Sequence, residues 1–299
     1  VPRLRRAAIP TRRFMPMRVL PPSVSLNLRN HRKLLLVDRR CAFTGGMNIS
    51  ARHLLEQESA NVAADVHFHL RGPIVDRLVT IFREDWAAAG AVADCPLTAA
   101  APQVSAPGPE SAAVPPESCQ CRLIADGPGD ELDRLPLLIS GVVSAARSRV
   151  WVMTPYFLPE ARLVGALQSA ALRGVDVRIV VPERSNWPPV DWAMGHGLWR
   201  LVNVGVQIVL QPPPFCHTKY LLIDDNYALV GSSNLDPRSL RLNFELNVEV
   251  FCPALNAELA AHFEAALASG AAIDQSRIRD RGVLIRLRDA FAALFTPYL

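Results

Sequence analysis

Residues 217–225, HTKYLLIDD, place a histidine, a lysine and an aspartate in and around a short apolar run, and HRKLLLVDR at 31–39 repeats the pattern. Laid over each other without gaps, the two stretches and the residues after them match at five positions: His31 with His217, Lys33 with Lys219, Asp38 with Asp224, Gly45 with Gly231 and Asn48 with Asn234. An internal repeat of this kind indicates two related structural units.

The repeat continues further along the chain. ADVHFHLRGP at 64–73 lies over FELNVEVFCP at 244–253, so Asp65 falls opposite Glu245. The first copy has gained a few residues around ARHLLEQESANVA. We therefore expect Asp65 and Glu245 to occupy matching places, on a strand that could run beside the strand of each motif.

The composition is that of a globular protein with an anionic partner. Of 299 residues, 50% are hydrophobic and 20% are charged, which provides enough apolar surface for two domains. The net charge of +4, carried mostly by arginine, favours phosphate, nucleic acid or acidic lipid. Six cysteines without metal-ligand spacing predict reduced thiols in a cytosolic compartment and no zinc site. No apolar run reaches the length of a membrane span.

The chain divides into four segments. Residues 87–120 are rich in Ala, Pro and Ser and predict a linker between an N-terminal half, 1–86, and a C-terminal half, 121–265, with a basic tail at 266–299. In the C-terminal half the pattern predicts strands and helices in alternation: a strand at 149–157, a helix at 161–174, a strand at 175–182, a helix at 191–205 and a strand at 206–215. This alternation is typical of an α/β layered fold.

The residue types of the repeat suit chemistry at a phosphate diester. Residues i and i+2 of a strand share a face, so each histidine and its lysine point the same way, and two such pairs meeting would form one pocket. One imidazole attacks phosphorus and the other protonates the leaving alcohol, which needs no metal and no cofactor. Four residues are candidates for holding the phosphate oxygens: Lys33, Lys219, Asn48 and Asn234.

The carboxylates have different expected roles. Asp65 and Glu245 are the candidates for orienting the two imidazole rings, as the aspartate does in a Ser-His-Asp site. Asp38 and Asp224 close the motif, and we expect them to pair with backbone or basic groups at a turn. Gly45 and Gly231 are expected to be structural.

At these residues the chain resembles the phospholipase D superfamily, whose mark is a doubled HxKxxxxD with a downstream Gly and Asn. GSSNLDPRSLRLNFELNVEVF at 231–251 is similar to the bacterial cardiolipin synthase branch, as are TPYFLPE and AFTGGMNIS. The resemblance implies two pseudo-symmetric α/β/α layered halves that share one active site, with His31 as nucleophile and His217 as acid. It also implies transfer of a phosphatidyl group from phosphatidylglycerol to a second lipid hydroxyl, at the anionic cytoplasmic face of a bacterial inner membrane.

One departure from the pattern concerns the first half. It begins at what corresponds to Leu198, inside a helix of the second half, and so lacks about two strand-helix units. This predicts an in-frame segment upstream of residue 1, which leaves room for a membrane anchor there.

Three alternatives stay open for the function: hydrolysis to phosphatidic acid, a nucleic-acid phosphodiesterase, and an inactive membrane-associated scaffold. The absence of a basic stretch interleaved with stacking aromatics disfavours nucleic acid, and no obligate protein partner is predicted. The tail has apolar residues at helical spacing, and it either lies on an anionic bilayer or packs on the core: Leu284, Leu287, Phe291 and Leu294. The spacing of Trp187, Trp192 and Trp199 favours the core over a lipid entrance.

Overall fold

The centre of the protein is a nine-stranded sheet. The computed structural model describes residues 2–15, 28–54, 62–90, 95, 97, 118–129 and 133–298. In the sheet the strand order is β1 (Arg29–Asn30), β13 (Asn243–Phe251), β12 (Tyr227–Gly231), β11 (Tyr220–Ile223), β7 (Arg149–Met153), β8 (Asp176–Pro182), β9 (Gln207–Gln211) and β14 (Ala271–Ile273), and β6 (Gln120–Asp126) also pairs with β13. Strands β7, β8 and β9 run parallel, whereas β11, β12 and β13 form an antiparallel meander.

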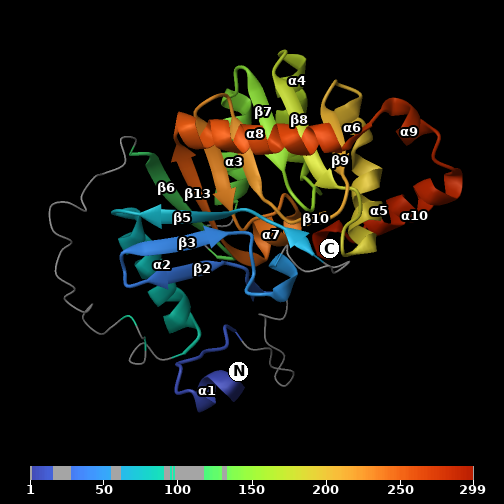
Figure 1. The fold of residues 1–299 in the computed structure, drawn as a ribbon. Helices are drawn as coiled ribbons and strands as arrows, with labels where there is room; N and C mark the ends of the chain where they lie inside the picture. Colours follow the sequence, from blue (N-terminus) through green and yellow to red (C-terminus); the bar gives the residue numbers. More distant parts are fainter. Residues whose placement is uncertain are drawn as a thin grey trace.

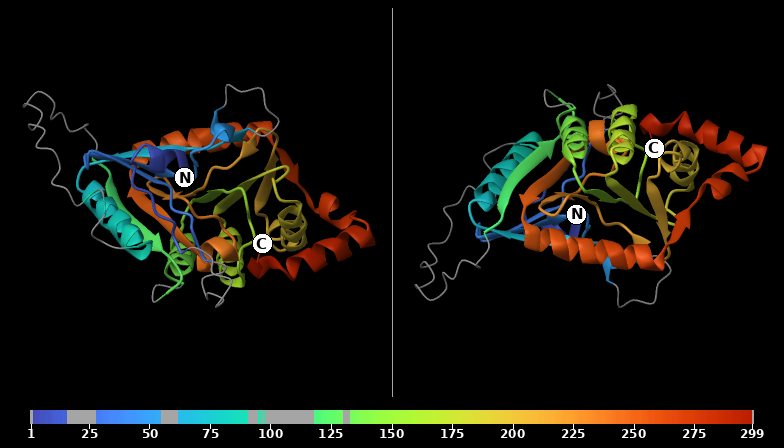
Figure 2. Two further views of the ribbon diagram at one scale, coloured as in Figure 1. Left: turned by 90° about the horizontal axis from the view of Figure 1, so that it is seen from below. Right: turned by 90° about the horizontal axis from the view of Figure 1, so that it is seen from above.

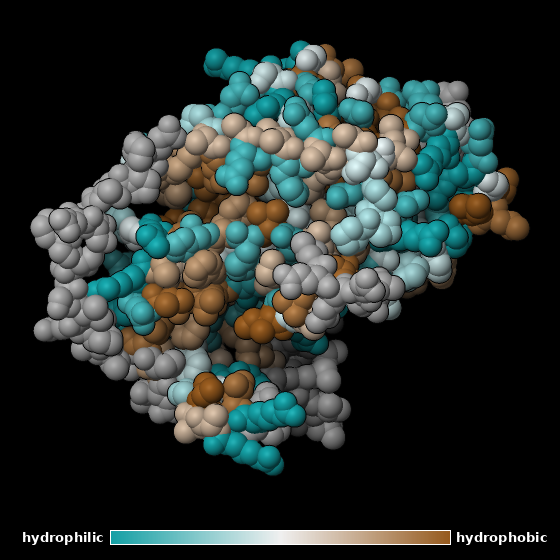
Figure 3. All heavy atoms as spheres, viewed as in Figure 1, coloured by the Kyte–Doolittle hydropathy of each residue, from teal (hydrophilic) through white to brown (hydrophobic). Residues whose placement is uncertain are grey.

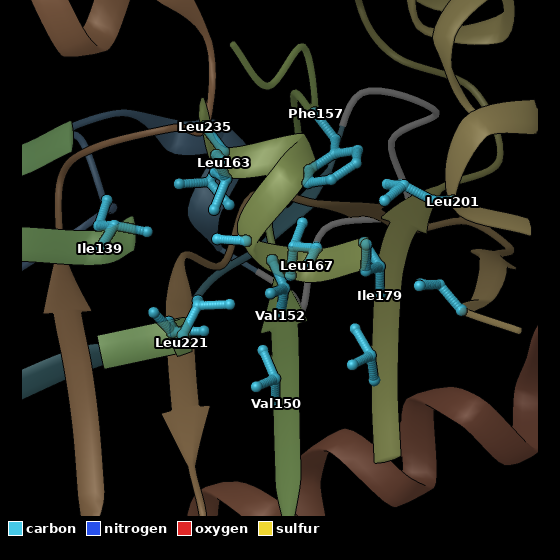
Figure 4. Packing of buried hydrophobic residues seen from close by; sticks show 14 of the residues in the cluster. Ile139, Val150, Val152, Phe157, Leu163, Leu167, Ile179, Leu201, Leu221 and Leu235 are labelled. Atoms are coloured by element: carbon cyan, nitrogen blue, oxygen red, sulfur yellow. The ribbon is translucent and has the colours of Figure 1, made fainter. Parts of the chain in front are cut away.

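Helices cover both faces of this sheet, as Figures 1 and 2 show. One face carries α3 (Arg134–Ala145), α4 (Ala161–Leu172), α5 (Pro188–Gly197) and α6 (Trp199–Val202), and α8 (Pro253–Ser269) crosses the other. Successive side chains of β7 point to opposite faces of the sheet, so this strand contributes residues to both layers of the core. Val150 and Val152 pack in the cluster drawn in Figure 4, while Trp151 and Met153 pack against the α8 side.

A second, smaller sheet belongs to the first half of the chain. It consists of β2 (Leu34–Val37), β3 (Cys41–Gly45) and β5 (His67–Arg71), with α2 (Ile74–Ala88) packed on one face. Its register matches that of the meander in the large sheet, because Gly45 pairs with His67 as Gly231 pairs with Asn247. Each HxKxxxxD motif is therefore followed by the same three-stranded arrangement.

Short elements complete the fold. β4 (Ala63–Ala64) pairs in parallel with β10 (Phe215–Cys216). The others are the helices α1 (Pro2–Arg6), α7 (Pro237–Arg241), α9 (Gln275–Arg279) and α10 (Val283–Ala293), and single 3-10 turns at Ala51–His53 and Thr296–Tyr298. In the part of the chain that is described, none of the helices combines the length and apolarity that crossing a bilayer requires.

The α/β class is confirmed, and the element boundaries differ in places from those predicted. The helix expected at 191–205 starts at Pro188 and divides at Leu198. The tail expected from 266 begins inside α8, and its strand β14 pairs with β9 and so joins the large sheet. Of the linker expected at 87–120, all but 87–90, 95, 97 and 118–120 lies outside the described residues.

Two expectations about single residues are wrong, and the sequence leaves a third question open. Cys119 and Cys252 form a disulfide instead of remaining reduced, and it joins the segment before β6 to the residue before α8. Trp187 and Trp199 do not pack in the core, since 55% and 45% of their surfaces are exposed, whereas Trp192 is partly buried against it as expected. For the apolar tail residues, where the sequence leaves bilayer and core as alternatives, the core does not apply, because they are exposed on and just after α10.

Candidate active site

Each motif histidine is paired with a carboxylate from the other half of the chain. His31 Nδ1 lies 2.9 and 3.0 Å from the two carboxylate oxygens of Glu245, and His217 Nδ1 lies 2.7 Å from Asp65 Oδ2. Both carboxylate side chains are fully buried, at 0% exposure. With Nδ1 engaged in this way, Nε2 is the ring nitrogen of each histidine that is left to react.

The backbone fixes this crossed arrangement. β1 runs parallel to Asn243 and Phe244, and the His31 amide donates a hydrogen bond of 2.9 Å to the Phe244 carbonyl. The His217 amide donates one of 2.7 Å to the Ala64 carbonyl in the same way. In each case the accepting residue directly precedes the carboxylate that binds the ring, so the main chain sets the distance between ring and acid.

Each motif lysine lies against the backbone of its own histidine. Lys33 Nζ donates to the His31 carbonyl at 2.7 Å, and Lys219 Nζ donates to the His217 carbonyl. These are the only two lysines in the sequence, among 32 basic residues. The charges of Lys219, Asp65 and Glu245 all act on Lys33, so groups from both halves surround one ammonium.

Burial changes the protonation of the site. It lowers the pKa of His217 to about 4, although the hydrogen bond to Asp65 opposes this shift. It also lowers the pKa of Lys33 to about 7 and that of Lys219 to about 8, against the attraction of the carboxylates. Near neutral pH, His217 is therefore neutral in the free protein, and the lysines can lose or regain a proton as a charged ligand enters.

Glycine is required where the two meanders approach the carboxylates. A Cβ on Gly231 would lie 2.4 Å from the Leu246 carbonyl oxygen, and one on Gly45, whose φ is +149°, would lie 2.8 Å from the Val66 carbonyl oxygen. Both distances are far inside van der Waals contact. Any larger residue would push β5 or β13 away, and with it the adjoining carboxylate.

Two residues that the sequence analysis missed support Glu245. The Ser232 hydroxyl donates to Oε2 at 2.5 Å, and Asn243 Nδ2 donates to Oε1 at 3.1 Å. In the repeat Ser232 lies opposite Gly46, where a Cβ would come within 2.6 Å of Asp65 Oδ2. The signal available in the sequence was that Ser232, a polar residue, lies opposite Gly46 in two copies that otherwise match. This difference indicates that Glu245, the longer acid, needs a hydrogen-bond donor beside it, whereas Asp65, the shorter acid, needs free space beside it.

The two motif aspartates share a backbone conformation but not a set of partners. Asp38 and Asp224 both have positive φ, at 52° and 50°. Asp224 accepts hydrogen bonds from the amides of Arg147, Ser148 and Arg149, which matches the expected turn role. Asp38 is exposed, and among the described residues it has no such partner. No strand equivalent to β7 lies beside β2 in the described part of the first half.

The matched asparagines also differ. Asn234 is buried, at 6% exposure, and its Oδ1 has no hydrogen-bond partner among the described residues, whereas Asn48 is exposed. The backbone amide of Asn48 donates a hydrogen bond to His53 Nε2 at 3.4 Å, and the ring centroid of His53 lies 5.9 Å from that of His217. His53 comes from the insertion that the repeat does not match, which is why sequence reasoning passed over it.

His53, Asp65 and His217 form a group with metal-ligating atoms within 4.8 Å of one another. Two nitrogens and one oxygen are a ligand set that zinc accepts. His217 Nδ1 and Asp65 Oδ2 are already hydrogen-bonded to each other, so these two atoms are engaged without a metal. The sequence predicts no metal, and no step below uses one.

The layered α/β fold and the duplicated HxKxxxxD motif agree with the resemblance to the phospholipase D superfamily. Residues 139–267 match the family model described as "Cardiolipin synthase, PLD-like domain". Residues 139–267 thus form a phospholipase D-like domain of the cardiolipin synthase family.

Whole-chain similarity gives the same family. The chain is 34% identical over 299 residues to cardiolipin synthase A of Pseudomonas aeruginosa, which covers all of this chain and 59% of that protein. It is 31% identical over 297 residues to a cardiolipin synthase of Geobacillus sp., covering 99% of this chain and 57% of the relative. The chain thus spans less than three fifths of the length of each of these relatives.

A solved structure supports the fold alone. Phosphatidylserine synthase from Haemophilus influenzae superposes with a TM-score of 0.64 over 90% of this chain and 71% of that one. The sequence identity is 15%, so this likeness concerns the arrangement of elements and not the chemistry.

Proposed function

We propose that the protein is a phosphatidyltransferase of the cardiolipin synthase type, which works at a membrane surface. It moves a phosphatidyl group from phosphatidylglycerol, or a related phospholipid, to the hydroxyl of a second lipid. The observation that carries this proposal is the pair of crossed histidine–carboxylate contacts beside the half-buried Lys33 and the buried Lys219. The similarity to cardiolipin synthases supports the choice of substrates.

The first half-reaction forms a phosphohistidine. Nε2 of one histidine attacks phosphorus, the bond from phosphorus to the glycerol oxygen breaks, and the imidazolium of the other histidine gives its proton to the departing glycerol. Lys33 and Lys219 stabilise the non-bridging oxygens as negative charge accumulates on them. Asp65 and Glu245 hold the rings in the tautomer that leaves Nε2 facing the phosphate.

The second half-reaction reverses these roles. The histidine that gave up its proton now takes one from the hydroxyl of the second lipid, whose oxygen attacks phosphorus. The bond between phosphorus and nitrogen breaks and the first histidine is restored. With a second phosphatidylglycerol as acceptor the products are cardiolipin and free glycerol, and with water they are phosphatidic acid and glycerol.

The assignment of the nucleophile rests on two opposing indications. The resemblance to the superfamily favours His31. The lowered pKa of His217, at about 4, favours His217, because an attacking imidazole must be neutral. Acid quenching of the enzyme during turnover of a labelled lipid, followed by peptide mapping, decides between them, since the label is on the peptide of one histidine or the other.

The function is tested by incubating the protein with phosphatidylglycerol vesicles and separating the lipid products. We expect cardiolipin and an equal amount of glycerol, and loss of both products in His31→Ala and in His217→Ala. Phosphatidic acid in place of cardiolipin would reassign the protein to hydrolysis. Full turnover by either histidine variant would contradict the mechanism.

A further inference from the structure

Helix α10 turns a row of apolar side chains towards solvent. Successive residues of a helix lie about 100° apart around its axis, and the apolar side chains of this row fall within an arc of about 120°. This α10 face consists of four residues of the helix and two in the turn directly after it, with exposures of 47% to 82%: Val283, Leu284, Leu287, Phe291, Leu294 and Phe295. Asp289 and Ala292, on the opposite side of the helix, are buried. Figure 3 shows hydrophobic atoms at the right-hand edge, where Figure 1 places α9 and α10.

Positive charge flanks this apolar face. From Arg277 to Asp289 the sequence has five arginines and two aspartates, a net charge of +3. Arg281 and Arg288 share the single carboxylate of Asp289, which leaves that cluster positive. Arg286 is exposed, and it has no acidic partner in the part of the chain that is described. An apolar strip bordered by arginines is complementary to a bilayer with anionic headgroups.

A groove beside α10 adds a place for a headgroup. It has a volume of about 890 Å³ and lies between α5, α6 and α10. Its lining combines His196, Arg281 and Arg286 with the apolar surfaces of Trp199 and Leu287. The exposed indole of Trp199 provides the amphipathic ring that suits the boundary between headgroups and acyl chains.

One short segment, residues 156–159, links this surface to the active site. The Tyr156 ring lies 6.4 Å from Phe215, whose ring is 6.0 Å from that of His217. The next three residues, 157–159, line a cavity of about 170 Å³ together with Ala293 and Thr296, at the end of α10. The α10 face therefore ends a few side chains from the catalytic histidine.

We propose that the α10 face and its flanking arginines dock the protein on an anionic bilayer and so hold the active site at the lipid surface. The partner is the membrane itself: the apolar α10 face contacts its acyl chains, and the arginines contact the negatively charged phosphates above them. This inference deepens the proposed function and rests on it for the effect on turnover. The binding of vesicles does not depend on catalysis and can be measured separately.

The test uses the 299-residue chain with Leu287→Glu and Phe291→Glu combined. Vesicles of phosphatidylcholine with and without phosphatidylglycerol are sedimented and the bound protein is measured. We expect the wild type to bind the anionic vesicles, with binding that falls as salt rises, and the double variant to bind at least about tenfold less. The matched control is Leu172→Glu, because Leu172 is 74% exposed on α4, away from the α10 face.

Turnover separates this inference from the proposed function. On phosphatidylglycerol vesicles the double variant should lose activity in proportion to binding, while on a short-chain phosphatidylglycerol dissolved as single molecules it should match the wild type. A wild type that binds vesicles but makes no product from either substrate would overturn the function and leave the docking surface standing. Thermal unfolding of the variant checks that its fold is intact.

Three outcomes would overturn the docking surface. One is equal vesicle binding by the wild type and the double variant, and another is an equal loss in the Leu172→Glu control. The third is a lipid-free wild type that sediments as a dimer and that the double variant converts to a monomer, since the face would then be covered by a second copy of the chain.

Discussion

At the scale of single residues, the site depends on which cation and which acid occupy each place. The sequence uses arginine almost everywhere and keeps lysine for Lys33 and Lys219. An ammonium can lose its proton when buried and a guanidinium cannot, so lysine at these two positions allows the charge of the empty pocket to adjust. Asp65 and Glu245 each contact Nδ1 of a histidine and leave its Nε2 out of that contact.

Removing the charge of Asp65 should slow catalysis without unfolding the protein. In Asp65→Asn the amide keeps the size of the side chain but no longer fixes the His217 tautomer or balances its positive charge. We expect kcat on phosphatidylglycerol to fall by about 100-fold or more, with a small change in KM. The control is Asp76→Asn on α2, an exposed position where kcat should not change. A kcat within twofold of the wild type would show that the ring needs no carboxylate.

The doubled motif was sufficient to predict the identity of these residues, but not how they pair. Superposing the two copies shows that Asp65 corresponds to Glu245, and it contains no information on which histidine each acid faces. That depends on β1 lying beside β13 and on β4 lying beside β10, which are contacts between distant segments. His53 was missed for a related reason, because it has no counterpart in the repeat.

At the scale of secondary structure, the close approach of β12 to β13 places Glu245. Gly231 lies at the end of β12 opposite Asn247, two residues from that acid. There is no room for a methyl group between the two strands. The lack of space at this glycine therefore fixes the position of the carboxylate that contacts His31.

Gly231→Ala should destabilise the fold, whereas an equivalent change on a helix should not. We expect the free energy of unfolding to fall by about 1–3 kcal/mol, since the new Cβ would overlap the Leu246 carbonyl oxygen. The matched control is Gly165→Ala on α4, where nothing lies within 4 Å and the change should stabilise by about 0.5–1 kcal/mol. Urea unfolding measures both. A loss of stability of the same size in the two variants would exclude the overlap as its cause.

Periodicity predicted the elements of the C-terminal half well and their surroundings less well. The strand and helix patterns from 149 to 215 match β7, α4, β8, α5, α6 and β9. The same periodicity favoured a core position for Trp187 and Trp199, and both are exposed. An amphipathic pattern identifies an apolar face but not what covers it, because that depends on how the helix is docked.

At the scale of the whole molecule, the site adds a pH dependence to folding. The folded state lowers the pKa of His217 from 6.5 to about 4 by burial. Between these values the unfolded chain binds a proton that the folded chain does not. Stability should therefore rise with pH through this window and fall as the solution is acidified from about pH 6.5 to about pH 4.

We expect the wild type to lose about 1–3 kcal/mol of unfolding free energy across that window through His217. The measurement is urea unfolding at several pH values for the wild type and for His217→Gln, which has no titrating ring. The variant should show a shallower dependence on pH than the wild type. Parallel curves for the two proteins would mean that His217 titrates alike in the folded and unfolded chain.

The crossed pairing of histidines and acids has a consequence for how this sequence can change over evolutionary time. Neither copy carries a complete set of reactive groups, so the two cannot drift apart as independent duplicates do. Position 65 must covary with position 217, and position 245 with position 31. In related sequences a loss of one histidine should therefore be accompanied by relaxation of the acid in the opposite copy, while its own copy's acid is retained.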